Sequence, residues 1–264
     1  MKKIVAIALA SVMMLGLFSS CSGKDSNGGN GDSKKEFVVG FDADFPPMGF
    51  KDDSGNYVGF DLDLAKEAAE RMGLEFVAQP INWDSKDQEL SSGNIDCIWN
   101  GFTISGREDK YAWTDAYMEN KQVVVVNADS DISKLSDLAG KTVAVQKDSS
   151  GLAAVNDNAE LKDSFGSLLE EDNYLNAMME LESGAVDAIV MDEIVARYQI
   201  QTSGKNFKVL DESVASETYG VGFDLKNTEL RDQVQKTLEE MAADGTMAKI
   251  SNEWFGTDVT IIGK

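Results

Sequence analysis

Charged side chains follow several segments that have the pattern of buried strands. Arg107 comes shortly after the predicted strand at 95–99, and Asp192 comes directly after the one at 186–191. A guanidinium can bind a carboxylate through two parallel hydrogen bonds, and a carboxylate is a natural counterion for an ammonium group. Together these two side chains could hold the opposite ends of a zwitterion, so their positions favour a binding site for a free amino acid.

Neutral groups near the same strand ends would complete this site. Ser149 and Ser150 open a predicted helix after the strand at 142–146, and the N–H groups at the start of a helix bind anions. The hydroxyl of Thr103 and a backbone carbonyl near Gly101 could accept hydrogen bonds from the ammonium group. Charge-assisted bonds of this kind contribute about 1.5–3 kcal/mol each, so a set of them would give roughly micromolar affinity after the cost of ordering.

Aromatic and acidic side chains would contact the rest of the ligand. Phe45 and Trp83 could enclose its side chain. Asp42 and Asp84 favour a cationic or polar side chain, although Asp42 is also compatible with glutamine. Taken singly, each candidate has a more ordinary interpretation as a surface ion-pair partner, a helix cap or a core residue, and only their joint occurrence at strand ends favours a site. The predicted binding residues are Asp42, Phe45, Trp83, Asn100, Gly101, Thr103, Arg107, Gln146, Ser149, Ser150 and Asp192.

Strands and helices alternate along the chain and would position these residues. Apolar segments predict strands at 37–41, 74–78, 95–99, 123–126, 142–146 and 186–191. Asp61 is expected to cap the first helix, which should end at Gly73. A β-α-β-α-β order indicates a mostly parallel sheet covered by helices, and ligands of such sheets bind beyond the carboxyl ends of the strands. We therefore expect an α/β protein with two lobes of similar plan and a cleft between them.

The composition excludes several functions. The chain of 264 residues has 24 Lys and Arg, 46 Asp and Glu, and no histidine. Nucleic acid is a poor candidate partner because phosphate binding needs a basic surface. Without histidine there is no Ser-His-Asp or Cys-His catalysis and no imidazole-bound zinc, so we expect no metal, no cofactor and no catalytic residues. The acidic surface would aid solubility or, alternatively, steer cationic ligands.

The start of the chain has the features of an export signal. Two lysines precede an apolar run at 4–18, which is short for a bilayer span, and 1–20 is therefore interpreted as a signal peptide. Two serines and Cys21 resemble the end of a lipobox, in which the cysteine is lipidated, although Phe18 stands where leucine is usual. An ordinary cleaved signal is the alternative. Residues 21–35 are polar and predict a flexible tether, so we expect a body anchored by lipid to the outer face of the cell membrane.

Five segments together resemble one known family. They are 40–48 (GFDADFPPM), 59–65 (GFDLDLA), 93–104 (GNIDCIWNGFTI), 138–145 (LAGKTVAV) and 241–246 (MAADGT). With these segments, residues 36–256 resemble the polar amino-acid solute-binding proteins of bacterial ABC importers, the type 3 family of extracellular solute-binding proteins. The resemblance implies that the family's binding roles belong to the residues named above, with much the same roles as their chemistry predicts.

The resemblance implies a periplasmic-binding-protein fold of the second type, with two crossings between the lobes. Lobe 1 would comprise 36–124 and 220–264, and lobe 2 would comprise 125–219. Closure of the hinge around the ligand would present the closed form to the permease of an ABC transporter. The expected ligand is a polar L-amino acid, with a cationic or cystine-like one favoured, and the expected protein is a monomer.

One departure from the family pattern concerns the carboxylate-binding arginine. The family usually has five residues from the threonine position to this arginine, whereas Arg107 follows Thr103 by four. A one-residue deletion in the loop would account for the difference. Asn100 and Gly101 also replace the small hydroxyl residues that are commoner in the family.

Two other functions stay open on the sequence alone. Some secreted dehydratases and murein lyases resemble the same fold and need a general acid or base in the cleft. The carboxylates that could serve are Asp42, Asp44, Asp84 and Asp192. A receptor input domain is the second alternative and would require a separate signalling partner.

Overall fold

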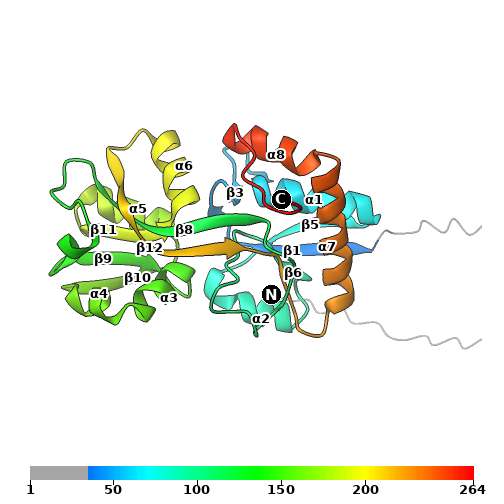
Figure 1. Cartoon of the computed structure of the whole chain (residues 1–264), viewed down its shortest axis with the longest axis horizontal. Helices are drawn as coiled ribbons and strands as arrows, with labels where there is room; N and C mark the ends of the chain where they lie inside the picture. The colour runs from blue at the N-terminus through cyan, green and yellow to red at the C-terminus, as the bar shows by residue number, and fades with distance from the viewer. Residues whose placement is uncertain (1–34) are drawn as a thin grey trace, which may run out of the picture. The chain divides into compact units, whose positions relative to one another are not determined.

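The computed structural model describes residues 35–264 (Figure 1). The expected signal peptide at 1–20, the lipid-attachment residue Cys21 and all but the last residue of the tether at 21–35 lie outside the described residues. Within residues 35–264, none of the helices has the length and apolar character that a membrane span requires.

Lobe 1, as we call it here, contains a five-stranded sheet with the order β5-β1-β6-β13-β7. The strands are β1 (Glu36–Phe41), β5 (Glu75–Pro80), β6 (Cys97–Ile98), β7 (Ala112–Trp113) and β13 (Gly222–Phe223). β1 pairs in parallel with β5 and β6, whereas β13 pairs antiparallel with β6 and β7. The helices are α1 (Phe60–Met72), η1 (Trp83–Ser85), α2 (Lys86–Ser91), α7 (Thr228–Ala243) and α8 (Thr246–Phe255). A small sheet adds β2 (Asp44–Phe45), β3 (Gly49–Lys51) and β4 (Tyr57–Val58).

Lobe 2 contains a second five-stranded sheet with the order β10-β9-β11-β8-β12. The strands are β8 (Met118–Asn127), β9 (Thr142–Gln146), β10 (Ser167–Glu171), β11 (Ala188–Asp192) and β12 (Phe207–Tyr219). β9 pairs in parallel with β10 and β11, and β8 pairs antiparallel with β11 and β12. The helices are η2 (Leu135–Leu138), α3 (Ser150–Asp157), α4 (Ala159–Ser164), α5 (Tyr174–Ser183) and α6 (Glu193–Ser203).

Two long neighbouring strands, β8 and β12, connect the lobes. Their antiparallel register ends with Tyr219 opposite Met118, and Figure 1 shows the two strands running side by side between the two groups of elements. At the lobe 1 end, Tyr219 forms a bridge with Thr103. The chain thus crosses twice between two α/β lobes, which is the expected architecture. Because β8 already begins at Met118, the boundary expected near 125 stays a prediction.

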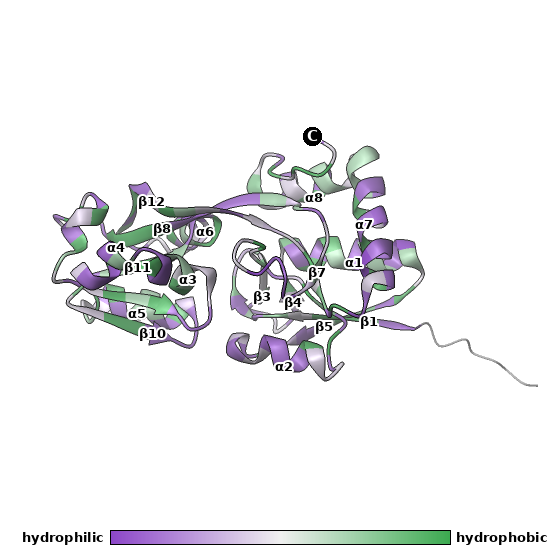
Figure 2. Cartoon of the chain, turned by 60° about the horizontal axis from the view of Figure 1, so that its bottom comes forward, coloured by the Kyte–Doolittle hydropathy of each residue, from purple (hydrophilic) through white to green (hydrophobic). Residues whose placement is uncertain are grey.

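The buried side chains explain why these segments form strands and helices. In β8, Val123 and Val125 belong to one apolar cluster, whereas Val124 and Val126 belong to another. The strand is therefore buried on both faces, as its continuous apolar run predicts. By contrast, α7 is mainly hydrophilic (Figure 2) and buries one face.

The start of α1 differs from the prediction. Gly59, and not Asp61, occupies the N-cap position, and no side chain caps the helix. Gly59 has φ of 151°, and a Cβ atom there would lie 2.2 Å from the carbonyl oxygen of Met48, so the close approach requires glycine. The expectation that Asp61 caps this helix is therefore wrong; its side chain is fully buried and points elsewhere. The helix ends at Gly73 in a left-handed conformation, as predicted.

Candidate functional site

The structure brings all eleven predicted binding residues together around one pocket, which we call the inner pocket. Lobe 1 contributes Asp42, Phe45, Trp83, Asn100, Gly101, Thr103 and Arg107, and lobe 2 contributes Gln146, Ser149, Ser150 and Asp192. A small molecule in this pocket would therefore contact both lobes.

The ends of the strands place these residues at the pocket. Asp42 follows β1, Gln146 ends β9 and Asp192 ends β11. Gly101 lies beyond β6 with φ of 55°, and a Cβ atom there would lie 3.1–3.3 Å from the rings of Phe45 and Tyr219. A glycine is therefore needed here both for its backbone conformation and for the close approach of the two rings.

One part of the lining of the inner pocket, which we call the anion side, is suited to an anion. Arg107 donates from Nη2 to the carbonyl of Asp148 in lobe 2 (3.2 Å) and from Nη1 to the carbonyl of Thr103 (3.3 Å). Ser149 caps α3, because its hydroxyl accepts a hydrogen bond from the N–H of Leu152 (3.0 Å). A guanidinium thus lies next to the N-terminus of a helix, and both favour a carboxylate.

Another part of the lining of the inner pocket, which we call the cation side, is suited to a cation. Asp192 is 2% exposed, and its Oδ1 atom accepts hydrogen bonds from the hydroxyl of Tyr219 (2.6 Å) and from Nδ2 of Asn120 (2.9 Å). Asn120 also donates to Glu217 (2.6 Å), so two buried carboxyl groups share one amide. Burial and the neighbouring Glu217 raise the pKa of Asp192 well above its usual range. Within the described part of the chain, neither carboxyl group has an ion-pair partner.

Two buried polar groups of the inner pocket have no hydrogen-bond partner among residues 35–264. They are the hydroxyl of Thr103, which is 2% exposed as a residue, and the Nδ2 amide of Asn100, which is 1% exposed. A buried polar group without a partner costs free energy. A polar ligand in the inner pocket would supply partners for both groups.

Sequence reasoning missed several side chains that shape the cation side. Glu217 and Tyr219 lie on β12, a strand that the sequence pattern did not predict. Asn120 and Gln122 lie on β8, where Gln122 donates to Glu217 (2.9 Å) and to the hydroxyl of Ser150 (3.0 Å). Only the pairing of β8 with β12 places these residues next to Asp192, so no local signal could identify them.

Asp42 forms a hydrogen bond between the lobes and lies at the edge of the inner pocket. It accepts hydrogen bonds from Nε2 of Gln146 in lobe 2 (2.7 Å) and from the N–H of Asp44 (2.8 Å). Burial is the largest influence on this carboxyl group and raises its pKa to about 6. Asn100 accepts a hydrogen bond from the N–H of Asp42 (2.8 Å) and so fixes this loop.

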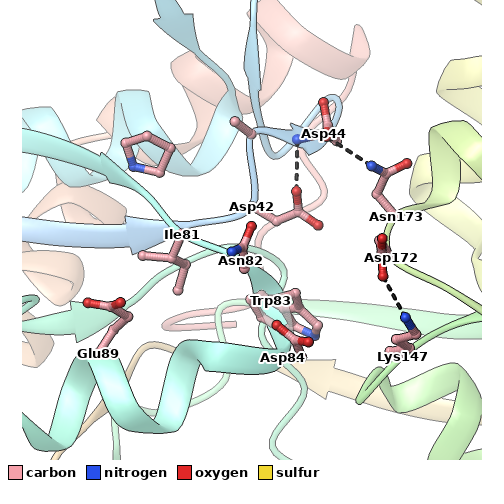
Figure 3. A pocket seen from close by; sticks show the side chains of 12 residues that line it. Asp42, Asp44, Ile81, Asn82, Trp83, Asp84, Glu89, Lys147, Asp172 and Asn173 are labelled. Atoms are coloured by element: carbon pink, nitrogen blue, oxygen red, sulfur yellow. Dashed lines mark hydrogen bonds and ion pairs between the residues drawn. The ribbon is translucent and has the colours of Figure 1, made fainter.

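A larger and more acidic hollow, which we call the outer pocket, adjoins the inner one (Figure 3). The two pockets share Asp42 and Trp83, and the empty space of the outer pocket measures about 1140 Å³, including the part open to solvent. Its carboxylates are Asp42, Asp44, Asp84, Glu89 and Asp172. Its cation Lys147 forms an ion pair with Asp172 (2.6 Å), as Figure 3 shows. The outer pocket therefore has an excess of negative charge.

Asp61 is a buried residue that fixes part of the backbone of the inner pocket. Its Oδ2 atom accepts hydrogen bonds from the N–H of Gly101 (2.5 Å) and from the hydroxyl of Tyr117 (2.9 Å). Its Oδ1 atom has no partner among the described residues. Burial raises the pKa of Asp61 to about 7, against the two hydrogen bonds that lower it. Asp61 thus holds the backbone of Gly101 in place and does not cap the start of α1.

The change Asp61→Asn is expected to flatten the pH dependence of stability. Because the folded-state pKa is about 7 and the unfolded value is 3.8, the folded state keeps a proton that the unfolded state releases between these pH values. The stabilisation by this proton is complete below pH 3.8 and is lost as the pH rises through about 7. The free energy of unfolding of the variant should therefore rise relative to that of wild type, by up to about 1.4 kcal/mol for each pH unit across this window.

Urea unfolding of both proteins at intervals from pH 4 to pH 8 measures this difference. The exposed Asp53→Asn change is the control, because it removes one surface carboxylate and leaves Asp61 in place. Parallel profiles for wild type and Asp61→Asn would contradict the role assigned to this carboxyl group.

Comparison with known proteins extends over almost the whole described chain. The family described as bacterial extracellular solute-binding proteins, family 3, matches residues 37–257. The L-cystine-binding protein TcyA of Bacillus subtilis (strain 168) is 32% identical over 98% of this chain and 100% of its own length. The arginine-binding extracellular protein ArtP of the same strain is 30% identical over 97% of this chain and 98% of its own.

A solved structure is similar in fold as well as in sequence. It is an ABC uptake transporter substrate-binding protein from Streptococcus pneumoniae with bound histidine. The two structures agree with a TM-score of 0.83 at 34% identity, over 89% of this chain and 99% of the other. The two α/β lobes and their two crossings are therefore the expected periplasmic-binding-protein fold of the second type. With the match over residues 37–257, the chain belongs to family 3 of the bacterial extracellular solute-binding proteins.

Proposed function

We propose that this protein is the extracytoplasmic substrate-binding subunit of an amino-acid ABC importer and binds a polar L-amino acid between its lobes. The observation that carries the proposal is the polarity of the inner pocket. Arg107 and the N-terminus of α3 line it together with the buried Asp192, which has no cationic partner among residues 35–264. These groups are complementary to the carboxylate and the ammonium group of one zwitterion. Relatives that bind arginine, cystine or histidine support this ligand class.

The outer pocket supports a long ligand whose far end carries positive charge. A side chain leaving the inner pocket between Asp42 and Trp83 would enter a hollow with five carboxylates and one already paired lysine. Such a hollow favours the guanidinium or ammonium group of a cationic amino acid, or the second ammonium group of cystine. A second carboxylate, as in glutamate, would be repelled there.

Closure of the hinge is the proposed mechanism of capture. A ligand that contacts Arg107 in lobe 1 and Asp192 in lobe 2 binds the closed form better than the open one, and so shifts the population toward closure. The permease would then recognise the closed form. Lipidation of Cys21 would keep this monomeric body at the outer face of the cell membrane, on the tether that follows it.

A thermal-shift screen of the twenty common amino acids, cystine and ornithine is expected to single out a cationic amino acid or cystine. A ligand that binds only the folded protein raises its melting temperature in proportion to RT ln(1 + [L]/Kd). At a ligand concentration a hundred times Kd, the gain is about 2.7 kcal/mol, which corresponds to about 5–11 °C for a protein of this size. Calorimetry with the best ligand would then give its affinity. If none of these compounds raises the melting temperature, the proposed function is wrong.

The same screen separates binding from catalysis. Asp42 has a raised pKa of about 6, which is a property that a general acid in an enzyme of similar fold would also need. We propose that the protein is not an enzyme, so the bound compound should be recovered unchanged by mass spectrometry after prolonged incubation. Conversion of this compound, or of a prephenate-like acid added to the protein, would instead identify an enzyme.

A further inference from the structure

An ion pair connects the lobes beside the anion side of the inner pocket. Lys86, the first residue of α2 in lobe 1, is only 1% exposed, yet it carries an ammonium group. This group donates to the carboxylate of Asp148 in lobe 2 and more weakly to the carbonyl of Trp83 (3.3 Å). It also lies 5.0 Å from the centre of the Trp83 ring. A buried lysine is costly without a counterion, so the contact between the lobes at this point depends on this partner.

The partner residue has an unusual backbone. Asp148 has φ of 51°, and no other residue of the described chain except glycines has a positive φ. This conformation is unfavourable for a residue with a Cβ atom, although aspartate tolerates it better than most. An aspartate at such a position needs a compensating interaction, and the ion pair with Lys86 supplies one.

The same residue also contacts the proposed carboxylate-binding arginine. The carbonyl of Asp148 accepts hydrogen bonds from Nη2 of Arg107 (3.2 Å) and from Nζ of Lys86 (3.4 Å). The next residue is Ser149, the cap of α3. Asp148 therefore joins the two parts of the anion side, the guanidinium from lobe 1 and the helix N-terminus from lobe 2.

Lys86 itself does not line the inner pocket. Its effect on a ligand would therefore pass through Asp148 and Arg107, which makes Lys86 a positioning residue. Burial lowers the pKa of Lys86 from its usual value, while Asp148 opposes this change.

We propose that the ion pair between Lys86 and Asp148 sets the position of Arg107 against the start of α3, and so builds the carboxylate subsite and favours the closed form before a ligand arrives. The first part of this inference rests on the proposed function, because it concerns the ligand's carboxylate. The second part, the bias toward closure, does not depend on any ligand.

The test uses the full-length protein and the variants Lys86→Met, Asp148→Asn and their combination. Calorimetry with the amino acid that gives the largest thermal shift should show three- to tenfold weaker binding for each single variant. The double variant should bind about as weakly as either single one, because both changes remove the same interaction. Lys205→Met, which breaks the ion pair with Glu182 within lobe 2, is the matched control and should bind like wild type.

A measurement without ligand provides the second readout. Spin labels at the exposed positions Ser92 in lobe 1 and Asn156 in lobe 2 report the distance between the lobes. The variants Lys86→Met and Asp148→Asn should both shift the ligand-free distance distribution toward longer, more open distances. A role confined to local packing would weaken folding without moving this distribution.

The possible outcomes separate the two proposals. If wild type binds none of the amino acids, the proposed function fails, but the distance measurement still tests the ion pair. If wild type binds and both single variants bind within twofold of it, or if the losses add in the double variant, the positioning role is wrong. If Lys86→Met does not fold, Asp148→Asn retains the lysine and gives the same two readouts.

Discussion

Replacing Arg107 with alanine is expected to weaken amino-acid binding by at least tenfold while leaving the ligand-free protein folded. The guanidinium is the cation that the structure places next to the start of α3, where it donates to the carbonyl of Asp148 (3.2 Å). A tenfold loss corresponds to about 1.4 kcal/mol, less than the 1.5–3 kcal/mol of one hydrogen bond to a charged group. Arg107→Lys should also bind more weakly, because an ammonium group cannot pair with a carboxylate through two parallel N–H groups. Calorimetry with the ligand found by thermal shift measures both effects.

A ligand without its carboxylate identifies the contact that is lost. The decarboxylated amine of the same amino acid should bind wild type weakly and should bind Arg107→Ala with nearly the same affinity. Lys110→Ala, a change at an exposed cation in the same loop, is the control and should bind like wild type. If Arg107→Ala binds the intact amino acid within twofold of wild type, Arg107 does not hold the carboxylate.

The parts of the fold that could be predicted are those with a strong local pattern. The strand at Thr142–Gln146 was predicted with its observed bounds, because its central residues are apolar and buried on both faces. The 13-residue strand β12 was not predicted, because it is half-exposed, carries many polar residues and is interrupted by register shifts between Val209 and Ala215. What makes this segment a strand is its partner β8, and pairing of distant segments leaves little trace in local sequence.

The location of the site followed from a general property of α/β sheets, but its finer interactions did not. Strand ends converge at one edge, so the eleven candidates could be expected to lie near one another, and they line the inner pocket. The interaction of Lys86 with Asp148 joins residues 62 positions apart and could not be read from spacing. Asp61 was assigned to a helix cap because an aspartate near the start of a helix usually caps it, whereas tertiary structure buries it against Gly101.

The change Asp192→Asn is expected to have opposite effects on binding and on stability. Binding should weaken by at least tenfold, because the ligand's ammonium group loses its counterion. The ligand-free protein should instead become more stable at neutral pH. Asparagine can still accept the hydrogen bonds from Tyr219 and Asn120, and, unlike aspartate, it needs no proton to stay neutral when buried next to Glu217.

The pH dependence follows from the raised pKa of Asp192. The folded state holds a proton that the unfolded state has already released, so the stabilisation by this proton is present at low pH and is lost as the pH rises above the usual aspartate range. The gain in stability of Asp192→Asn over wild type should therefore increase with pH, as urea unfolding at several pH values would show. A ligand analogue that lacks the amino group should bind the variant and wild type alike.

Glu193→Gln is the matched control, because it removes the neighbouring carboxylate, which pairs with Arg197 on the surface of α6. It should leave the affinity unchanged. A loss of affinity in Asp192→Asn that came with an equal loss of stability would mean that this carboxyl group supports the fold instead of the ligand. A binding role predicts lower affinity together with higher stability. In that role the carboxyl group destabilises the ligand-free protein and contributes only when the ligand is bound.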